Sequence, residues 1–462
     1  MRGTSKTAVA AAVAVATAAL TACGGGSGAG SDDAGGGPGQ RADQRAGAGG
    51  PEAPELAVPE EFDNTGGWGV PASEGAEQFA VAPHAGALLF ARVTGHGEPV
   101  TVHARDLATG APLWQGEPVE RLPGEKPLTE GRALHVTSKG EEDYAVLLTS
   151  GTEGADGVNK GSGVTRLHVY AVDASGTGAP ERVIEVPGET GAGGYRVQPT
   201  DGLVYLPGAG AVDVSTGTTR EVPAAERKAP ADAEGCRAGF SDCDANPSVM
   251  AVTADGPLVN GADMFWRGGP GGWSSADAAV RPGELTDEHD SARVLAYLNG
   301  RAVVQWEAEW EGPGANVVSL HDGADGAVEA SVTCAQEWLP GSTREDVTGP
   351  RLSADGRYLH LDTVLFDLER GEGHCFGPTE ERRSVTLTAV DAARGTAYGF
   401  SPPTGHFEPQ TPARVALADG AAEALPEGVL LPEYVDGDVA LFDVDSATEG
   451  GDGFDVVVYA RR

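Results

Sequence analysis

The chain has 462 residues, of which 69 are glycine and 31 are proline, and its formal net charge is −37. Short runs rich in Val, Thr and Tyr between these glycines and prolines indicate many short strands joined by turns, and they exclude a fold of long helices. A charge this negative repels nucleic acid and anionic lipid headgroups, so we expect no nucleic-acid partner.

Residues 1–22 predict a secretory signal peptide. Arg2 and Lys6 precede an apolar run from Ala8 to Leu20, which is too short for a transmembrane helix. The end of this run, Leu20-Thr21-Ala22-Cys23, resembles the bacterial lipobox, in which small residues precede a cysteine that receives diacylglycerol. The resemblance implies lipidation of Cys23, which would anchor the protein at the cell membrane, on its extracytoplasmic face. The alternative is an ordinary signal peptide followed by an incidental cysteine.

Residues 23–59 predict the lipidated cysteine and a flexible tether. Gly24 to Gly50 is a low-complexity tract of Gly, Ala, Ser and Asp, which is too poor in apolar side chains to fold. A tract of this composition would hold a folded body away from the membrane surface. The folded domain is therefore expected over residues 60–462.

From residue 84 onward, short turns followed by apolar alternation recur about every 50 residues, which is the length of a β-propeller blade. Each turn is expected to join the innermost strand of a blade to the second strand, because Asp and Gly provide the side-chain hydrogen bond and the positive φ of a tight hairpin. The eight turns are His84-Ala85-Gly86, Glu130-Gly131, Asp201-Gly202, Asp255-Gly256, Asn299-Gly300, Asp355-Gly356, Arg394-Gly395 and Asp436-Gly437.

A second turn recurs further along most repeats, with Asp at its start and Gly at its end. It occurs at Asp106–Gly110, Asp173–Gly176, Asp213–Gly217, Asp322-Gly323 and Asp367–Gly371. The run Asp106-Leu-Ala-Thr-Gly-Ala-Pro-Leu-Trp114 resembles the repeat of the quinoprotein (PQQ-like) propeller family, in which a D-x-x-T-G turn joins the third and fourth strands and a Trp follows. The resemblance implies a bacterial lipoprotein that carries one propeller domain.

Eight inner turns predict an all-β protein with a single propeller of eight blades. Seven blades are the alternative, because the unit from Gly256 to Asp290 is irregular. The last blade has room for only three strands, expected over Val429–Pro432, Val439–Val444 and Phe454–Ala460. Its outermost strand is expected from the N-terminal side, over Gly66–Pro71, so that no sheet edge stays exposed.

Four cysteines follow Cys23, an even number, as expected for disulfides in an exported protein. Cys236 and Cys243 are predicted to close a small ring within one loop, and Cys334 and Cys375 to link two successive repeats. The alternatives are the other pairings of the four, or a zinc site, although no C-x-x-C is present.

Two aromatic residues are the candidate contact surface. Trp266 and Trp273 lie in a Gly-rich stretch and are predicted either to form a flat surface for a partner or to pack locally. The segments 151–163, 221–247 and 266–290 are the longest predicted loops, and recognition is expected there because loops carry most binding functions.

Two acidic segments offer weaker signals. Glu307, Glu309 and Glu311 fall on one strand face, where they either hold a cation or basic partner or simply face solvent. The stretch 242–246 has the ligand spacing that opens a calcium loop, but Pro247 and Thr253 stand where that loop needs Gly and Glu.

No catalytic residue, metal ligand or cofactor is predicted. The sequence has neither a G-x-S-x-G elbow nor an H-E-x-x-H motif, and no two cysteines are adjacent as in quinoprotein dehydrogenases. The expected function is a lipid-anchored binding or scaffolding module for a protein or another component of the cell envelope. The alternative is a propeller enzyme, either a quinone-dependent dehydrogenase or a hydrolase or lyase of cell-wall sugars.

Overall fold

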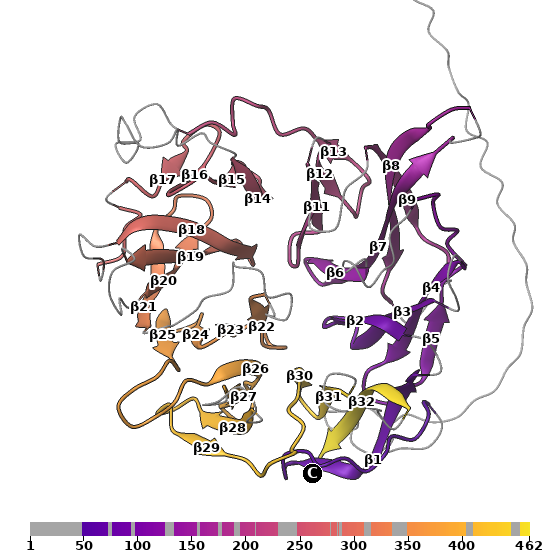
Figure 1. The fold of residues 1–462 in the computed structure, drawn as a ribbon, viewed down its shortest axis with the longest axis vertical. Helices are drawn as coiled ribbons and strands as arrows, with labels where there is room; N and C mark the ends of the chain where they lie inside the picture. Colours follow the sequence, from indigo (N-terminus) through magenta and orange to yellow (C-terminus); the bar gives the residue numbers. More distant parts are fainter. Residues whose placement is uncertain are drawn as a thin grey trace, which may run out of the picture. The chain divides into compact units, whose positions relative to one another are not determined.

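The computed structural model describes residues 49–72, 76–93, 98–124, 134–154, 158–173, 178–188, 195–207, 209–229, 247–277, 279–283, 285, 289–308, 316–334, 349–402, 410–444 and 453–462. All of them belong to one compact unit, Ala46–Arg462. Over these ranges the chain forms strands and no helix. The strands make eight antiparallel sheets of four strands each, which Figure 1 shows arranged in a ring.

Each of the first seven blades contains four consecutive strands, ordered from the innermost to the outermost. Blade 1 is β2 (Ala76–Ala82), β3 (Ala87–Val93), β4 (Val100–Asp106) and β5 (Pro112–Gln115). Blade 2 is β6 (Leu134–Lys139), β7 (Glu142–Glu153), β8 (Ser162–Ala171) and β9 (Arg182–Pro187). Blade 3 is β10 (Arg196–Gln198), β11 (Leu203–Leu206), β12 (Gly210–Asp213) and β13 (Thr219–Arg220). Blade 4 is β14 (Ser248–Thr253), β15 (Gly256–Asn260), β16 (Phe265–Arg267) and β17 (Trp273–Ser274).

The second half of the ring continues the same order. Blade 5 is β18 (His289–Leu298), β19 (Arg301–Ala308), β20 (Asn316–Asp322) and β21 (Val328–Cys334). Blade 6 is β22 (Arg351–Leu352), β23 (Tyr358–Leu361), β24 (Val364–Asp367) and β25 (Glu372–Cys375). Blade 7 is β26 (Thr386–Asp391), β27 (Thr396–Ser401), β28 (Thr411–Ala416) and β29 (Ala422–Ala424). Blade 8 combines β30 (Tyr434–Asp436), β31 (Val439–Asp443) and β32 (Phe454–Arg461) with β1 (Phe62–Pro71).

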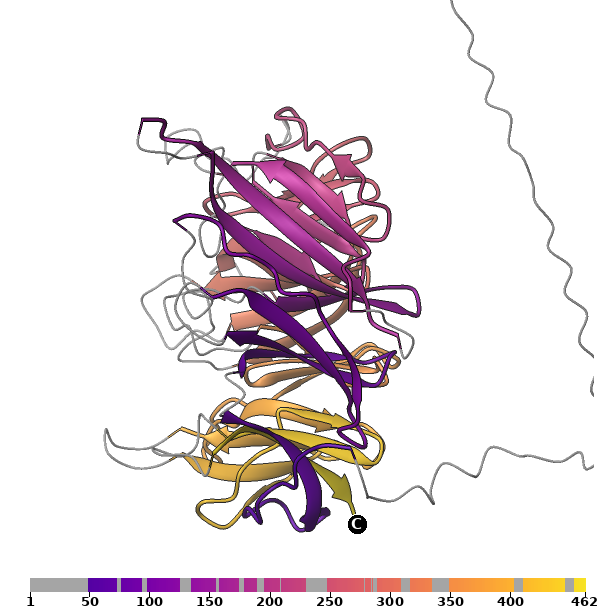
Figure 2. The ribbon, with the colours of Figure 1, turned by 90° about the vertical axis from the view of Figure 1, so that its right-hand side faces the viewer.

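A strand from the N-terminal side closes the ring. β1 runs antiparallel to β32, with Phe62 opposite Arg461 and Trp68 opposite Val458, and Figure 2 shows the two strands side by side. The predicted all-β propeller of eight blades, closed in this way, is confirmed. The seven-blade alternative is wrong, because the irregular region after Gly256 belongs to a complete sheet, β14 to β17.

The innermost strand of blade 8 lies later in the chain than the sequence predicts. It is Tyr434–Asp436, and the segment Val429–Pro432 is bonded elsewhere. The amide of Leu430 donates to the carbonyl of Ala57 (2.8 Å), and the carbonyl of Pro432 accepts from Thr388 Oγ1 (2.8 Å). Pro432 also has no N–H to contribute to a ladder.

Seven of the eight predicted inner turns join the first and second strands of a blade. The exception is in blade 2, where the turn is at Gly140 and Glu141, and Gly140 has a φ of +65°. The prediction at Glu130-Gly131 is wrong for this turn, and those two residues lie outside the described ranges. No Asp or Asn precedes Gly140, so the usual turn signal is missing there.

The D-x-x-T-G turn joins the third and fourth strands of blade 1, as predicted. Asp106 Oδ1 accepts hydrogen bonds from the Thr109 amide (2.8 Å) and from Thr109 Oγ1 (2.7 Å), and Gly110 has a φ of +71°. Asp213 and Asp367 cap the equivalent turns of blades 3 and 6 by accepting hydrogen bonds from backbone amides two and three residues on.

Tryptophans on two outermost strands pack against a glycine of the next blade. A Cβ added to Gly110 would lie 2.4 Å from Cδ2 of Trp68, and a Cβ added to Gly326 would lie 2.6 Å from Cδ2 of Trp273. Trp68 Nε1 also donates to the carbonyl of Leu107 (3.1 Å). These contacts join blade 8 to blade 1 and blade 4 to blade 5, and they require glycine at both turns because no side chain fits.

Side-chain amides of one blade bind the innermost strand of the next blade. Gln78 Oε1 accepts from the Leu134 amide (2.8 Å). Asn260 donates through Nδ2 to the Val294 carbonyl (2.8 Å) and accepts through Oδ1 from the Val294 amide (2.8 Å). An innermost strand has no further strand beside it, so these amides satisfy backbone groups of its free edge.

Candidate functional site

The connections between strands differ at the two ends of the blades. The first-to-second strand connections contain two to five residues, and the third-to-fourth connections contain four to ten. The connections from one blade to the next include much longer segments, at 116–133, 221–247, 275–288 and 335–350. Because successive strands alternate in direction, the first two kinds lie at one end of the blades, here named the turn end. The inter-blade and second-to-third strand connections lie at the other, here named the connection end.

Two of the predicted contact segments fall at the connection end. The segment 151–163 spans the link between β7 and β8, and 221–247 links blade 3 to blade 4. The third prediction, 266–290, is wrong in its first half, because that half forms β16, β17 and the tight turn between them. The connection end therefore has the longest stretches of chain between strands, and we take it as the candidate partner-binding region.

Two polar pairs lie where inner strands begin, at the connection end. The His135 Nε2 and the Tyr195 hydroxyl are 3.0 Å apart and link blades 2 and 3. Arg351 Nη1 donates to Glu433 Oε2 (2.7 Å) and to the Glu433 carbonyl (3.1 Å), which joins blade 6 to blade 8. The Arg351 and Glu433 side chains are each 30% exposed, so solvent reaches this pair. These groups place hydrogen-bond donors and acceptors at the connection end.

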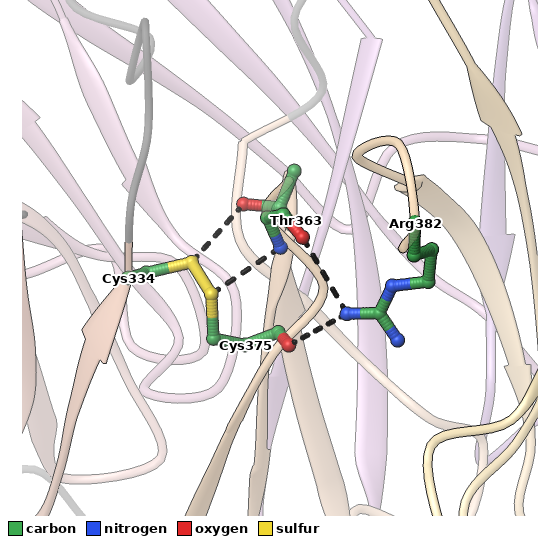
Figure 3. The surroundings of a disulfide bond; sticks show 5 residues. Cys334, Thr363, Cys375 and Arg382 are labelled. Atoms are coloured by element: carbon green, nitrogen blue, oxygen red, sulfur yellow. Dashed lines mark hydrogen bonds between the residues drawn. A yellow bond between two sulfur atoms is a disulfide. The ribbon is translucent and has the colours of Figure 1, made fainter. Parts of the chain in front are cut away.

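A disulfide holds the ends of two outermost strands. Cys334 ends β21 and Cys375 ends β25, and their sulfur atoms are 2.04 Å apart, which confirms the predicted pair. Thr363 Oγ1 lies 3.6 Å from Cys334 Sγ, and Arg382 Nη2 donates to the Cys375 carbonyl (3.2 Å); Figure 3 shows these contacts around the bridge. The bridge links blade 5 to blade 6 and holds in place the strand end from which the connection 335–350 departs.

The interpretation of Trp266 and Trp273 as a contact surface is wrong. Trp266 is 0% exposed and Trp273 is 5% exposed. Trp273 packs edge to face against Phe265, with 5.7 Å between ring centres, and against Gly326 of blade 5. Trp266 packs with Tyr205 in the core between blades 3 and 4. The neighbouring glycines form the turn between β16 and β17, and the next blade covers the strands themselves, so local packing is the correct alternative.

The remaining candidates from the sequence add little to a functional site. Cys23, Cys236, Cys243, the calcium-like stretch 242–246, Glu309 and Glu311 lie outside the described residues. Glu307 forms an ion pair with Arg293 (2.9 Å between Oε1 and Nη2), and both side chains are more than a third exposed. Glu307 thus faces solvent, which is one of the two alternatives predicted for Glu307, Glu309 and Glu311.

Four histidines of the described strands lie in buried or half-buried positions where a structural role fits better than a catalytic one. Burial is the largest cause that lowers the pKa of His103, His168 and His321 to about 4 and the pKa of His360 to about 3. The His321 Nδ1–H donates to the Gly326 carbonyl (3.0 Å), and Nε2 lies 2.6 Å from Ser319 Oγ. A neutral ring placed in this way holds a turn and is not an exposed base.

Two properties of the described ranges bear on metals and membranes. Within them, no group of three or more His, Cys, Asp or Glu side chains is placed to hold a metal ion. In the same ranges no helix has the length and apolar character needed to cross a bilayer.

The polar pairs of the connection end have no signal in the sequence. The members of the two pairs are 60 and 82 residues apart, and strand alternation indicates only which residues share a face of one sheet. One member of each pair has the same position relative to a strand. Tyr195 and Glu433 each stand immediately before an innermost strand.

Comparison with known proteins yields only distant likeness. No protein-family model and no curated protein matches the chain. An uncharacterized protein from Listeria monocytogenes is 8% identical at a TM-score of 0.32, over 85% of this chain and 91% of that one. The β-propeller domain of the trilobed protease from Pyrococcus furiosus is 10% identical at 0.31, over 79% and 86%. The GH74 xyloglucanase from Xanthomonas campestris is 12% identical at 0.29, over 84% and 52%. Scores this low do not bear on activity, and the propeller fold follows from the strand pairing itself.

Proposed function

We propose that this protein is a lipid-anchored, extracytoplasmic β-propeller that acts as a binding or scaffolding module. Its partner, a protein or another component of the cell envelope, contacts the connection end. The observation that carries the proposal is the difference between the two ends of the blades, with short capped turns at one end and the long inter-blade connections at the other. Binding surfaces are commonly built from long loops on a rigid scaffold.

The anchoring half of the proposal rests on the sequence. The lipobox resemblance at Leu20–Cys23 supports lipidation of Cys23, and residues 24–50 have the composition of a flexible tether. The disulfide between Cys334 and Cys375 is consistent with export, because structural disulfides persist in oxidising compartments. The Asp106 turn and the tryptophan-on-glycine contacts support the proposal that the repeats are of the quinoprotein-like kind.

The anchoring proposal is tested by replacing Cys23 with alanine. The variant should leave the membrane fraction and should no longer incorporate a labelled fatty acid. A Cys334→Ser, Cys375→Ser double variant is the control, and it should keep both the label and the membrane association. Cys23→Ala protein that stays in the membrane fraction would refute anchoring through Cys23.

The location of the partner is tested with photo-crosslinking residues placed at single exposed positions of the anchored protein. Glu120 and Arg383 represent the connection end, and Thr109 and Asp419 represent the turn end. Glu120 and Arg383 should give the same adduct, and Thr109 and Asp419 should give none. Adducts from the turn-end positions alone, or equally from all four, would contradict the proposal.

A further inference from the structure

A charged cleft of about 520 Å³ lies at the turn end, between blades 7 and 8. Three arginines and three glutamates line it together with three alanines and a threonine. The charged residues are Glu60, Glu61, Arg394, Arg414, Glu423 and Arg462. The volume is typical of a small-molecule site, and the other lining residues are small, so the charged groups decide what binds.

Glu61 has a carboxylate oxygen without a hydrogen-bond donor. Its side chain is 9% exposed, and Oε1 accepts from the Tyr398 hydroxyl (2.5 Å). Oε2 is buried and accepts no hydrogen bond from any described residue. Arg414 Nη1 is 3.8 Å from it, too far for a hydrogen bond. A buried acceptor without a partner is unfavourable, and an N–H group of a ligand would satisfy it once the Glu61 side chain turns toward the cleft, because Oε2 itself is not accessible to solvent.

Arg414 cannot supply that missing donor without losing other partners. Its Nε donates to Glu423 Oε2 (3.0 Å), and its Nη2 lies 2.9 Å from the same oxygen in an ion pair. Its Nη1 is 3.5 Å from Glu60 Oε1. Three carboxylates thus surround one guanidinium, and this side of the cleft has a surplus of negative charge that favours a ligand ammonium group.

The other side of the cleft carries two guanidiniums that are available. Arg394 and Arg462 are exposed, and neither forms an ion pair with a carboxylate in the described part of the chain. Arg462 Nη2 makes one long hydrogen bond, of 3.4 Å, to Asn64 Oδ1. In a chain with a net charge of −37, guanidiniums without carboxylate partners are suited to the carboxylate of a ligand.

We propose that this cleft binds a small zwitterion, a ligand with a free ammonium group and a free carboxylate, as in a short unmodified peptide. The ammonium group lies at Glu61 and the carboxylate at Arg394 and Arg462. An anion alone leaves Glu61 Oε2 without a donor, and a cation alone leaves both guanidiniums unpaired. The cleft is at the turn end, so this site is separate from the partner contact proposed for the connection end.

The test is calorimetric titration of the full mature protein at pH 7 with triglycine, N-acetyl-triglycine and triglycine amide. Triglycine should bind saturably, and blocking either terminus should weaken binding roughly tenfold or more, because each block removes a charge-assisted contact. An Arg394→Gln, Arg462→Gln double variant should lose a similar factor. Arg383→Gln, an exposed arginine outside the cleft, should bind like the wild type.

Glu61→Gln provides a second arm. Its amide oxygen can still accept from Tyr398, but the negative charge is gone, so triglycine should bind more weakly. A melting curve shows whether this variant folds, and the arginine pair decides the question if it does not. The proposal is overturned by an absence of saturable triglycine binding, by equal binding of the blocked peptides, or by an arginine double variant that binds like Arg383→Gln.

Discussion

Replacing Gly326 by alanine should lower the free energy of unfolding by about 2–4 kcal/mol, as the sum of two separable costs. Gly326 has a φ of +76°, where a residue with a side chain costs about 1 kcal/mol. The added Cβ would also lie 2.6 Å from Trp273 Cδ2, and overpacking of this kind costs about 1–3 kcal/mol. The turn has little room to move, because the His321 ring holds the Gly326 carbonyl.

Two further variants separate these costs. Gly86 has a φ of +59° and no atom within 4 Å of an added Cβ, so Gly86→Ala should cost only about 1 kcal/mol. In a Trp273→Ala background, Gly326→Ala should fall to the same value. The Gly326→Ala and Trp273→Ala variants form a double-mutant cycle. Removing Trp273 breaks no hydrogen bond of its side chain, because Nε1 has no partner among the described residues. Equilibrium urea unfolding followed by far-UV circular dichroism measures the wild type, the three single variants and the double variant.

A coupling energy near zero between Gly326 and Trp273 would contradict this prediction. If Gly326→Ala costs no more than Gly86→Ala, or costs as much without Trp273 as with it, then the tryptophan does not press on that glycine. The assignment of Trp273 to the contact between blades 4 and 5 would then be wrong.

Three other predictions concern the disulfide, one histidine and one asparagine. Replacing Cys334 and Cys375 by serine should lower the free energy of unfolding by about 2–4 kcal/mol, because the bridge spans 41 residues; a melting temperature unchanged by reduction of the wild type would contradict this. Burial lowers the pKa of His321 from 6.5 to about 4, so the unfolded state takes up the proton first and stability falls as the pH drops through that interval. His321→Asn should therefore flatten the pH dependence of the urea midpoint between pH 6.5 and pH 4, and an unchanged slope would count against it. Asn260→Ala should cost about 2–3 kcal/mol and speed amide exchange at Val294, whose amide and carbonyl both lose their partner; unaltered exchange would refute this role.

The blade pattern was predictable because each turn depends on the chemistry of a few neighbouring residues. The Asp-Gly and Asn-Gly turns act over two or three residues, and they indicated the correct strand boundaries around Asp355-Gly356 and Asp367–Gly371. Two predictions failed where that signal is weak. The turn at Gly140 has no preceding Asp or Asn, and Val429–Pro432 has the apolar content of a strand while its hydrogen-bond partners, Ala57 and Thr388, are far away in the chain.

The candidate sites were far less predictable. The Cys334–Cys375 bridge could be predicted from an even number of cysteines and from their places in successive repeats, but the cleft combines Glu61 near one end of the sequence with Arg394 and Arg462 near the other. Trp273 looked exposed because glycines precede it, and no local pattern indicates that the next blade covers an outer strand. Contacts between blades depend on the ring as a whole, and short-range alternation carries no information about them.

The pairing of β1 with β32 also determines when the ring can be completed. Phe62 and Arg461 face each other in this ladder, so the first strand to be synthesised waits for the last. During that interval β1 has no partner strand, and an unpaired edge can bind the same edge of another molecule. Loop-closure entropy grows only slowly with chain length, so the main cost of this arrangement is time. Removing β1 or removing β32 would leave blade 8 open at the same ladder, and we expect either truncation to make newly synthesised protein prone to aggregate.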